Sequence, residues 1–434
     1  MTHIAWWAFG LVAIGAIATV VVFSTLFLPD FFKPDMHTTC DADAGSEEFI
    51  AALARYFNVP VLRGGTVDIL QNGCRFFPTL LDAIRNARET INFQVYIFES
   101  RGIGQEFIEA FEQRARAGVE VRVLLDGFGS LRFKKRDRDR LRAAGVRLEF
   151  FRPLTWYGLI RAFKRDHRRA IVVDGQVGFT GGAAVADKWL GDARNEREWR
   201  DSLTRVTGPL VDGVQTAFGE NWFYRTGEIL AGEKFYPLAT KEVVAPKHLG
   251  SGPALIALVS SPVDASQPIR ILLWQSFACA RRRIWISNSY FVPEGRLRDV
   301  IMQRAREGVD VRILVPGPRT DAKPVRLAGH SHYEELLAAG VRIYEFQPSM
   351  MHAKTVVVDD EWTLVGSANM DKRSVKLNEE NLLGVRDADF AAAVAVGLLA
   401  DFQRSAEMQL EKVRARGLGV RLLERCSRLL VEQY

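Results

Sequence analysis

The sequence predicts an α/β protein built from two fused domains of one design, preceded by a single transmembrane helix. Two observations carry this prediction: a long internal repeat in which helix and strand patterns alternate, and an uncharged apolar segment near the N-terminus. The 434 residues, 48% of them hydrophobic, provide enough chain for two domains with a sizeable core. We place the anchor at residues 1–32, the first domain at 45–230 and the second domain at 250–434.

The apolar segment runs from Ile4 to Leu28 without a charged residue. At about 1.5 Å per residue, a helix of this length crosses the hydrocarbon core of a membrane. A cleaved signal peptide is the alternative, but no basic region precedes the segment, which is also long for such a peptide. We therefore expect a retained single-pass anchor. Only Lys33 follows it closely, so the positive-inside rule weakly places the large domains on the cytoplasmic side.

The internal repeat has a period of roughly 190 residues, far longer than the repeats of solenoid proteins. The segment "RARAGVEVRVLL" of the first half corresponds to "RAREGVDVRILV" of the second, and "LRAAGVRLEFF" corresponds to "LLAAGVRIYEF". In both copies a helix pattern ends at a glycine and a β-branched run follows, which indicates a helix-to-strand connection. Because helix and strand alternate, we expect a largely parallel sheet in each half. Residues 232–253, rich in lysine, proline and glycine, are the expected linker.

The second copy of the repeat carries the most specific polar pattern, "MHAKTVVVDDEWTLVGSANMD". His352 and Lys354 are two residues apart and share one face of a strand, and a hairpin would bring Ser367 and Asn369 to the same rim. A neutral imidazole can attack phosphorus, a cation and neutral donors can stabilise phosphoryl oxygens, and a second histidine can protonate the leaving alcohol. His167 lies at the matching position of the first copy, so the repeat predicts a two-histidine phosphodiester site.

From His352 to Asn369 the second copy resembles the HxKx4Dx6GSxN signature of the phospholipase D superfamily. The surrounding sequence is similar to that of bacterial cardiolipin synthases in three segments: "GVRIYEFQPSMMHAKTVVVD", "GSANMDKRSVKLNEE", and "WRDSLTRVTGPLV" after the first motif. The resemblance covers about residues 60 to 410 and implies two phospholipase D-like α/β domains in a pseudo-twofold relation. It also implies a phosphatidyltransferase of the bacterial inner membrane that makes cardiolipin from two phosphatidylglycerols and releases glycerol.

The resemblance further implies roles for single residues. His167 is expected to attack phosphorus and form a phosphohistidine, and His352 to act as the acid and base, although the sequence itself does not fix which histidine attacks. Each histidine is expected to have a carboxylate that orients its ring, matched by Glu380 in the second half and by Asp201 in the first. Ser367 is expected, with Asn369, to bind the substrate phosphate.

The first copy of the motif departs from the family pattern. Arg169 stands where the family has lysine, while Gly182 and Ala184 stand where it has serine and asparagine. Arg169 keeps the positive charge but is bulkier and forked, and Ala184 removes one donor, so reduced or retuned activity is an alternative. Asp174 and Asp359, the acidic residues of the two motifs, are expected to hold the site together rather than to perform chemistry.

The net charge of +6 fits anionic partners, here the phospholipids phosphatidylglycerol and cardiolipin and the membrane itself. Nucleic acid is not expected, because the basic residues are scattered and form no long groove. We expect no metal and no cofactor, since no acidic or histidine cluster accompanies the motifs. A phospholipase D-type hydrolase and a weakly active lipid-binding homologue are alternatives. A homodimer in which each chain supplies one His352 is the alternative arrangement of the site.

Two further segments are basic. An insert found only in the first half, "LTWYGLIRAFKR", interleaves aromatic residues with Arg161, Lys164 and Arg165, which suits a membrane interface or an anionic ligand as well as an ordinary surface helix. The tail from Lys412 to Val431 reads as a basic amphipathic helix, which can lie on an anionic membrane or pack on the second domain.

Overall fold

The computed structural model describes residues 14, 15, 17, 36–39, 41–153, 164–237, 252–261 and 267–431. The chain divides into two compact units, residues 1–39 and 40–434, and the second holds both halves of the repeat. The predicted anchor lies outside the described residues, apart from three helical positions at 14, 15 and 17. Within the described ranges, no helix has both the length and the apolar character needed to cross a membrane.

The first half builds a seven-stranded sheet. Its strands are β2 (Val67–Gln71), β3 (Thr90–Val95), β4 (Glu120–Asp126), β5 (Arg147–Phe151), β6 (Ala170–Val173), β7 (Val177–Gly181) and β8 (Ser202–Thr207). Across the sheet they lie in the order β2-β8-β7-β6-β3-β4-β5. Strands β3, β4 and β5 are parallel to one another, and the other neighbours are antiparallel.

The second half builds a nine-stranded sheet with the same plan. Its strands are β1 (Leu62–Arg63), β9 (Ala254–Ser260), β10 (Arg283–Ser287), β11 (Asp310–Pro316), β12 (Arg342–Phe346), β13 (Thr355–Val358), β14 (Trp362–Gly366), β15 (Glu380–Arg386) and β16 (Ser405–Glu407). They lie in the order β1-β9-β15-β14-β13-β10-β11-β12-β16, and only β10, β11 and β12 are parallel.

The sheets are therefore mixed, and the expectation of largely parallel sheets was wrong. The helix-glycine-strand units do give parallel neighbours, as expected for crossover connections. The histidine motifs instead form tight hairpins, β6–β7 and β13–β14, which can only be antiparallel. Each hairpin then continues by antiparallel pairing into β8 or β15, so most of each sheet is antiparallel.

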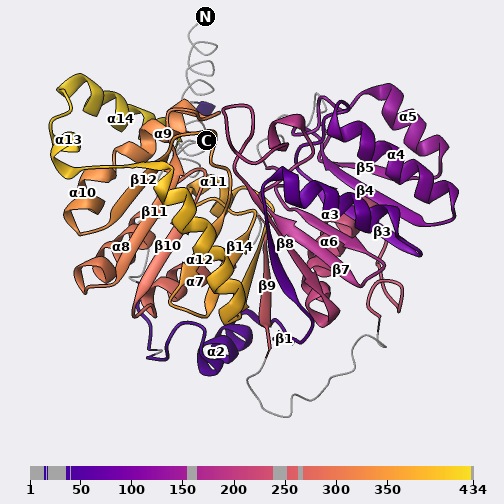
Figure 1. The fold of residues 1–434 in the computed structure, drawn as a ribbon, viewed down its shortest axis with the longest axis horizontal. Coiled ribbons are helices and arrows are strands. Elements are labelled where there is room, and N and C mark those ends of the chain that lie inside the picture. Colours follow the sequence, from indigo (N-terminus) through magenta and orange to yellow (C-terminus); the bar gives the residue numbers. More distant parts are fainter. Residues whose placement is uncertain are drawn as a thin grey trace, which may run out of the picture. The chain divides into compact units, whose positions relative to one another are not determined.

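The internal repeat appears in the strand register. Ile91 of β3 pairs with Val173 of β6, and Ile284 of β10 pairs with Val358 of β13. The two sheets thus place corresponding motif residues at corresponding points. Two α/β halves of one design, as predicted, form the body of the protein (Figure 1).

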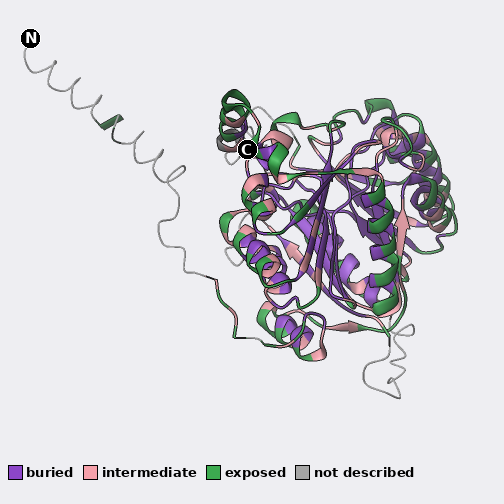
Figure 2. Cartoon of the chain, turned by 60° about the vertical axis from the view of Figure 1, so that its left-hand side comes forward, coloured by how far each residue is buried: buried purple, intermediate pink, exposed green. Residues whose placement is uncertain are grey.

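Helices cover the sheets on both faces. Those of the first half are α3 (Gly73–Arg85), α4 (Ile103–Arg116), α5 (Lys135–Ala143) and α6 (Val211–Thr226). Those that pack with the second half are α2 (Glu47–Phe57), α7 (Pro268–Ala278), α8 (Gly295–Arg306), α9 (Lys323–His330), α10 (Tyr333–Ala338), α11 (Lys372–Lys376), α12 (Ala388–Gln403), α13 (Leu410–Arg414) and α14 (Leu418–Val431). Figure 2 shows the buried strands inside and the exposed faces of the helices outside.

Helices α6 and α12 join the halves. α6 packs on β6 and β7 of its own sheet and on β9 of the other, while α12 packs on β13 and β14 and also on β2. Their buried residues belong to one apolar cluster that takes side chains from both sheets, including Val172, Val214, Val357 and Val394. A second cluster under α3 and α4 is rich in phenylalanine and belongs to the first half. The shared central core explains why the two halves form one compact unit.

The first elements of the unit pack on the second half. Phe49 of α2 meets the ring of Trp362 edge to face at 5.4 Å, and β1 pairs with β9. Residues 47–63 therefore pack with the second half, although the sequence placed them in the first domain, because β1 pairs with β9 and Phe49 packs on Trp362 at the start of β14. The tail also packs on the second half, α14 lying against α9, which leaves Leu418 and Leu422 exposed.

Candidate active site

The two histidines lie just before corresponding strands. His167 precedes β6 and His352 precedes β13, and both are buried. Both line one cavity of about 240 Å³. The two motif histidines of a single chain therefore meet, and no second chain is needed to bring them together.

Backbone hydrogen bonds between the halves hold the histidine segments in place. The His167 amide donates to the Glu379 carbonyl at 2.9 Å, and the Glu379 amide donates to the Arg165 carbonyl at 2.8 Å. In the other copy the His352 amide donates to the Arg200 carbonyl at 2.7 Å, and these two segments also form a parallel bridge, Arg200 with Met351. Each histidine segment thus leaves its own sheet and pairs with a segment of the opposite half.

This crossing decides which carboxylate each histidine meets. Nδ1 of His167 lies 3.1 Å from Oε2 of Glu380, and Nδ1 of His352 lies 2.7 Å from Oδ2 of Asp201. The sequence named the right carboxylates but assigned each to the histidine of its own half, which is wrong. The physical reason is the exchange of backbone segments, since Glu380 follows Glu379 and Asp201 follows Arg200.

Both carboxylates are completely buried and are themselves held in place. Asp201 accepts the indole N–H of Trp189 and the amide of Ser202, each at 2.8 Å. Glu380 accepts the hydroxyl of Ser374 at 2.8 Å and the amide of Asn378 at 3.2 Å. Fixed carboxylates on Nδ1 set the tautomer and leave Nε2 of each ring for chemistry.

One buried cation accompanies each histidine. Nζ of Lys354 donates to the carbonyl of His352, and Nη1 of Arg169 donates to the carbonyl of His167. Lys354 Nζ also lies 3.1 Å from Nε2 of His352, whereas no hydrogen bond is made by Nε2 of His167 within the described part of the chain. Burial lowers the pKa of Lys354 to about 7.

The same environment lowers the pKa of both histidines. Burial, and then the charge of Arg169, lower the pKa of His167 to about 4. Burial, and then the charge of Lys354, lower the pKa of His352 to about 3. The carboxylates act in the opposite direction but do not outweigh burial. A neutral ring is nucleophilic, whereas an acid must first gain a proton.

The two residues expected at the phosphate lie differently. Asn369 lines the cavity, and its Oδ1 accepts the hydroxyl of Ser289 at 2.7 Å, so its amide group can face the cavity. Ser367 is buried below the cavity wall, where its hydroxyl donates to Glu380. Ser367 therefore orients the carboxylate of the His167 pair, and its expected direct contact with phosphate is not part of this arrangement.

The motif aspartates lie at the far ends of the strands. Asp174 follows β6 and accepts the backbone amides of residues 88–90, and Asp359 follows β13 and accepts those of residues 281–283. Both adopt the left-handed backbone conformation of a tight turn, with φ of 53°. A four-residue strand, about 13 Å long, separates each aspartate from its histidine. They anchor the hairpins and belong outside the catalytic set.

Aromatic rings pack around both histidines, and the sequence analysis did not identify them. Tyr96 packs against His167 with ring centroids 4.9 Å apart, and Trp189 and Trp199 lie 5.4 and 5.3 Å from His352. The available signals were weak: Tyr96 directly follows a strand, and Trp199 stands next to the "RD" of the first half. These rings restrict the imidazoles and exclude water.

Further positive charge lines the cavity. Arg165, Lys188 and Arg373 line it together with Arg169. Lys354 contacts His352, which is itself a lining residue. The Arg165 guanidinium stacks over Phe128 at 4.2 Å, and Arg165 is the part of the basic insert that the structure describes beside the site. Residues 154–163 of that insert lie outside the described residues.

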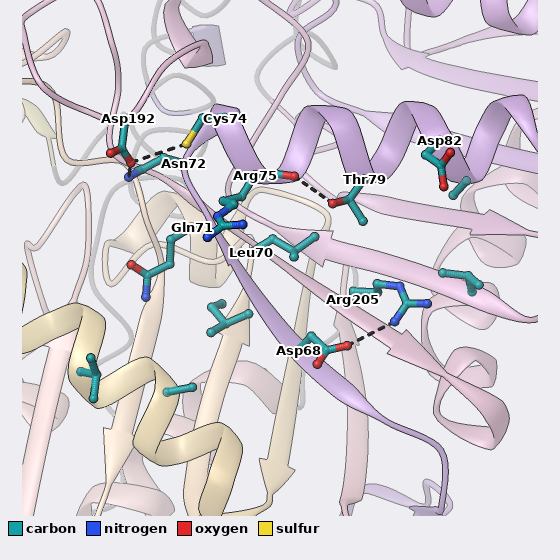
Figure 3. A pocket seen from close by; sticks show the side chains of 15 residues that line it. Asp68, Leu70, Gln71, Asn72, Cys74, Arg75, Thr79, Asp82, Asp192 and Arg205 are labelled. Atoms are coloured by element: carbon teal, nitrogen blue, oxygen red, sulfur yellow. Dashed lines mark hydrogen bonds and ion pairs between the residues drawn. The ribbon is translucent and has the colours of Figure 1, made fainter.

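A wider pocket of about 1080 Å³ lies between β2, α3 and α12 (Figure 3). Its charged groups are largely paired, as Asp68 with Arg205 at 3.2 Å. Its thiol, Cys74, is hydrogen-bonded to Asp192, and burial raises the pKa of that thiol. No histidine lines it. The pocket therefore lacks the groups for phosphoryl transfer.

No group of three or more histidine, cysteine, aspartate or glutamate side chains suited to a metal ion occurs within the described ranges. The described cysteines, Cys74, Cys279 and Cys426, form no disulfide with one another.

The chain matches the family model "Cardiolipin synthase, PLD-like domain" over residues 80–198 and 273–402. It is 34% identical over 388 residues to cardiolipin synthase A of Pseudomonas aeruginosa, covering 88% of this chain and 76% of that protein. It is 33% identical over 367 residues to cardiolipin synthase 1 of Bacillus anthracis, covering 84% and 72%.

Among solved structures, the phosphatidylserine synthase of Haemophilus influenzae shares the fold, with a TM-score of 0.68 and 17% identity over 90% of this chain and all of that one. The family match spans both halves of the repeat and both histidine motifs. The cardiolipin synthase family catalyses phosphatidyl transfer. The chain therefore belongs to the cardiolipin synthase family of the phospholipase D superfamily.

Proposed function

We propose that the protein joins two phosphatidylglycerols into cardiolipin and releases glycerol, through a phosphohistidine on His167. The observation that carries the proposal is that His167 and His352 line one cavity together with Arg169, and that a carboxylate of the opposite half holds each ring. Two histidines with fixed rings provide one nucleophile and one acid–base group. The names of the relatives supply the lipid class.

In the first step Nε2 of His167 attacks the phosphorus of one phosphatidylglycerol. The bond from phosphorus to the glycerol oxygen breaks, and glycerol leaves with a proton from Nε2 of the protonated His352, which regains it in the second step. The assignment of His167 as nucleophile is supported by its Nε2, which has no hydrogen-bond partner within the described residues, while Lys354 lies against Nε2 of His352. Arg169 and Lys354 stabilise the phosphoryl oxygens.

In the second step Nε2 of His352 takes a proton from a glycerol hydroxyl of the second phosphatidylglycerol. That oxygen attacks the phosphorus, the bond to His167 breaks, and cardiolipin is released. Asp201 stabilises the imidazolium that forms on His352, as Glu380 does for His167. An anionic phosphodiester in the cavity also raises the pKa of both histidines, because it offsets the cations that lower it.

We further propose that residues 1–32 anchor the chain in a bacterial inner membrane with the catalytic body on the cytoplasmic side. The support is the uncharged stretch from Ile4 to Leu28 and the lysine close behind it, Lys33. An anchored enzyme works where its lipid substrates lie. A protease-protection assay on sealed vesicles tests the side, and digestion of the body from the extracytoplasmic face would refute the orientation.

The function is tested with purified full-length protein and phosphatidylglycerol in detergent micelles, with products identified by mass spectrometry. Cardiolipin with an equal amount of glycerol is the expected result. Phosphatidic acid without cardiolipin would identify a hydrolase that passes the intermediate to water, and lipid binding without product would identify a non-catalytic homologue. Either outcome refutes the proposal. A variant with both His167→Ala and His352→Ala is the matched control for contaminating activity.

A further inference from the structure

The two halves of the site hold their cations in the same way but differ in the hydrogen-bond donors that surround them. Arg169 and Lys354 occupy matching motif positions, and each donates to the carbonyl of its own histidine. Lysine has a single nitrogen for this task. Arginine has three, so two nitrogens of Arg169 remain for other contacts.

In the second half, two asparagine amides lie at the end of the motif. Asn288 Nδ2 lies 3.5 Å from the carbonyl of Ala368, and Asn369 lines the cavity beside His352. The strand register places Val95 at the position that corresponds to Asn288, and the motif spacing places Ala184 at that of Asn369. Neither valine nor alanine has a side-chain donor, so the first half lacks both amides.

The guanidinium of Arg169 makes, in the first half, the carbonyl contact that Asn288 makes in the second. Its Nε lies 3.4 Å from the carbonyl of Ala183, the residue that corresponds to Ala368. That carbonyl belongs to the peptide that leads into Ala184, so the guanidinium lies beside the position where the amide is missing. Ala184 itself is buried in the phenylalanine-rich core, where a larger side chain must displace a neighbour.

The remaining nitrogen, Nη2, makes no hydrogen bond within the described residues although Arg169 is completely buried. Arg169 lines the cavity together with both histidines. A buried guanidinium nitrogen without an acceptor is costly, and a phosphoryl oxygen is the acceptor that the cavity is suited to receive.

We propose that Arg169 and Ala184 form a compensating pair: Arg169 supplies both the charge and the missing hydrogen-bond donor to the substrate phosphate, and Ala184 leaves the room for its guanidinium. This inference rests on the proposed function in that the ligand is a phosphodiester. The altered first motif is then a working phosphate site. Arg169 alone does there what Lys354 and Asn369 do together in the second half.

The test is a double-mutant cycle on phosphatidyl transfer by the full-length protein. Arg169→Lys keeps the charge but loses the donor, so kcat is expected to fall about 100-fold. Ala184→Asn crowds the guanidinium, and kcat is expected to fall at least about 10-fold. The double variant restores the lysine and asparagine pair and is expected within about 10-fold of wild type. A double variant as poor as the product of the two single losses would overturn the pairing.

The second half provides the matched control. Lys354→Arg alone places a guanidinium against Asn369 and is expected to be less active than Lys354→Arg combined with Asn369→Ala. If the single variant is the more active of the two, a guanidinium does not need a small neighbour and the inference is wrong.

A binding measurement separates this inference from the reaction. Calorimetry with inorganic phosphate at pH 5.5 is expected to show at least about 10-fold weaker binding to Arg169→Lys than to wild type, since one buried charge-assisted donor is lost. Equal affinities would refute the inference even if the double variant fails to fold. Wild-type protein that binds phosphate through Arg169 but forms no lipid product would refute the proposed function and leave the inference standing.

Discussion

The crossed pairing of histidines and carboxylates makes a quantitative prediction. Substitutions of His352 and Asp201 should have coupled effects on the free energy of unfolding, because the two side chains share a hydrogen bond. Substitutions of His167 and Asp201, which belong to the same half, should have additive effects. The perturbations are Asp201→Asn and the two histidine-to-glutamine changes. Hydrogen bonds to charged groups contribute about 1.5 to 3 kcal/mol, and the 2.7 Å contact of His352 is fully buried. We expect a coupling free energy near 2 kcal/mol for the crossed pair.

The contact between His167 and Glu380 should couple less strongly. Its distance is 3.1 Å, and Glu380 also accepts hydrogen bonds from Ser367, Ser374 and Asn378, so part of its interaction survives loss of the ring. We expect about 1 kcal/mol for this pair. The non-crossed combination of His167 and Asp201 should stay below about 0.5 kcal/mol, because the two residues share no hydrogen bond.

The assay is urea unfolding of wild type, single and double variants, with the coupling taken from the free energies of unfolding. Equal denaturant slopes across the set are the control that all variants unfold in the same way. A coupling for His167 with Asp201 that exceeds the one for His352 with Asp201 would refute the crossed arrangement. Turnover gives a second measure: Asp201→Asn should lower kcat by about 100-fold or more, because the ring loses its orientation and its charge partner.

Three other predictions follow from the site and the tail. Activity should survive saturating EDTA, because Arg169 and Lys354, which lie against the two histidines, supply the positive charge; loss on chelation that a divalent ion restores would contradict this. Binding of inorganic phosphate at pH 5.5 should take up protons, since His352 is neutral there with a pKa of about 3 and the anion raises that pKa; calorimetry in buffers of different ionisation enthalpy measures the uptake, and proton release would contradict the sign. Replacing the exposed Leu418 and Leu422 of α14 by glutamate should weaken binding of a chain starting at residue 41 to phosphatidylglycerol vesicles without shifting its melting temperature, and unchanged binding would remove the tail from the membrane contact.

The sequence by itself determined the architecture of two α/β halves and the identity of the histidines. Both rest on local patterns: helix ends at glycines, β-branched runs, and fixed motif spacings that recur in both halves. The hairpin after each histidine was also predictable, because an acidic turn residue separates two apolar runs. The mixed character of the sheets was not, since pairing direction depends on which strands become neighbours.

Only the tertiary structure decided which carboxylate serves which histidine. Glu380 lies close in sequence to His352 and Asp201 to His167, and spacing alone favours those pairs. The short backbone bridges at Glu379 and Arg200 exchange segments between the halves and reverse the assignment. Contacts of this kind join residues that are about 150 to 210 positions apart, so no local pattern encodes them. The same holds for Ser367: the motif set its residue type, but burial and its hydrogen bond to Glu380 in the folded chain decided that it supports the site from outside the cavity.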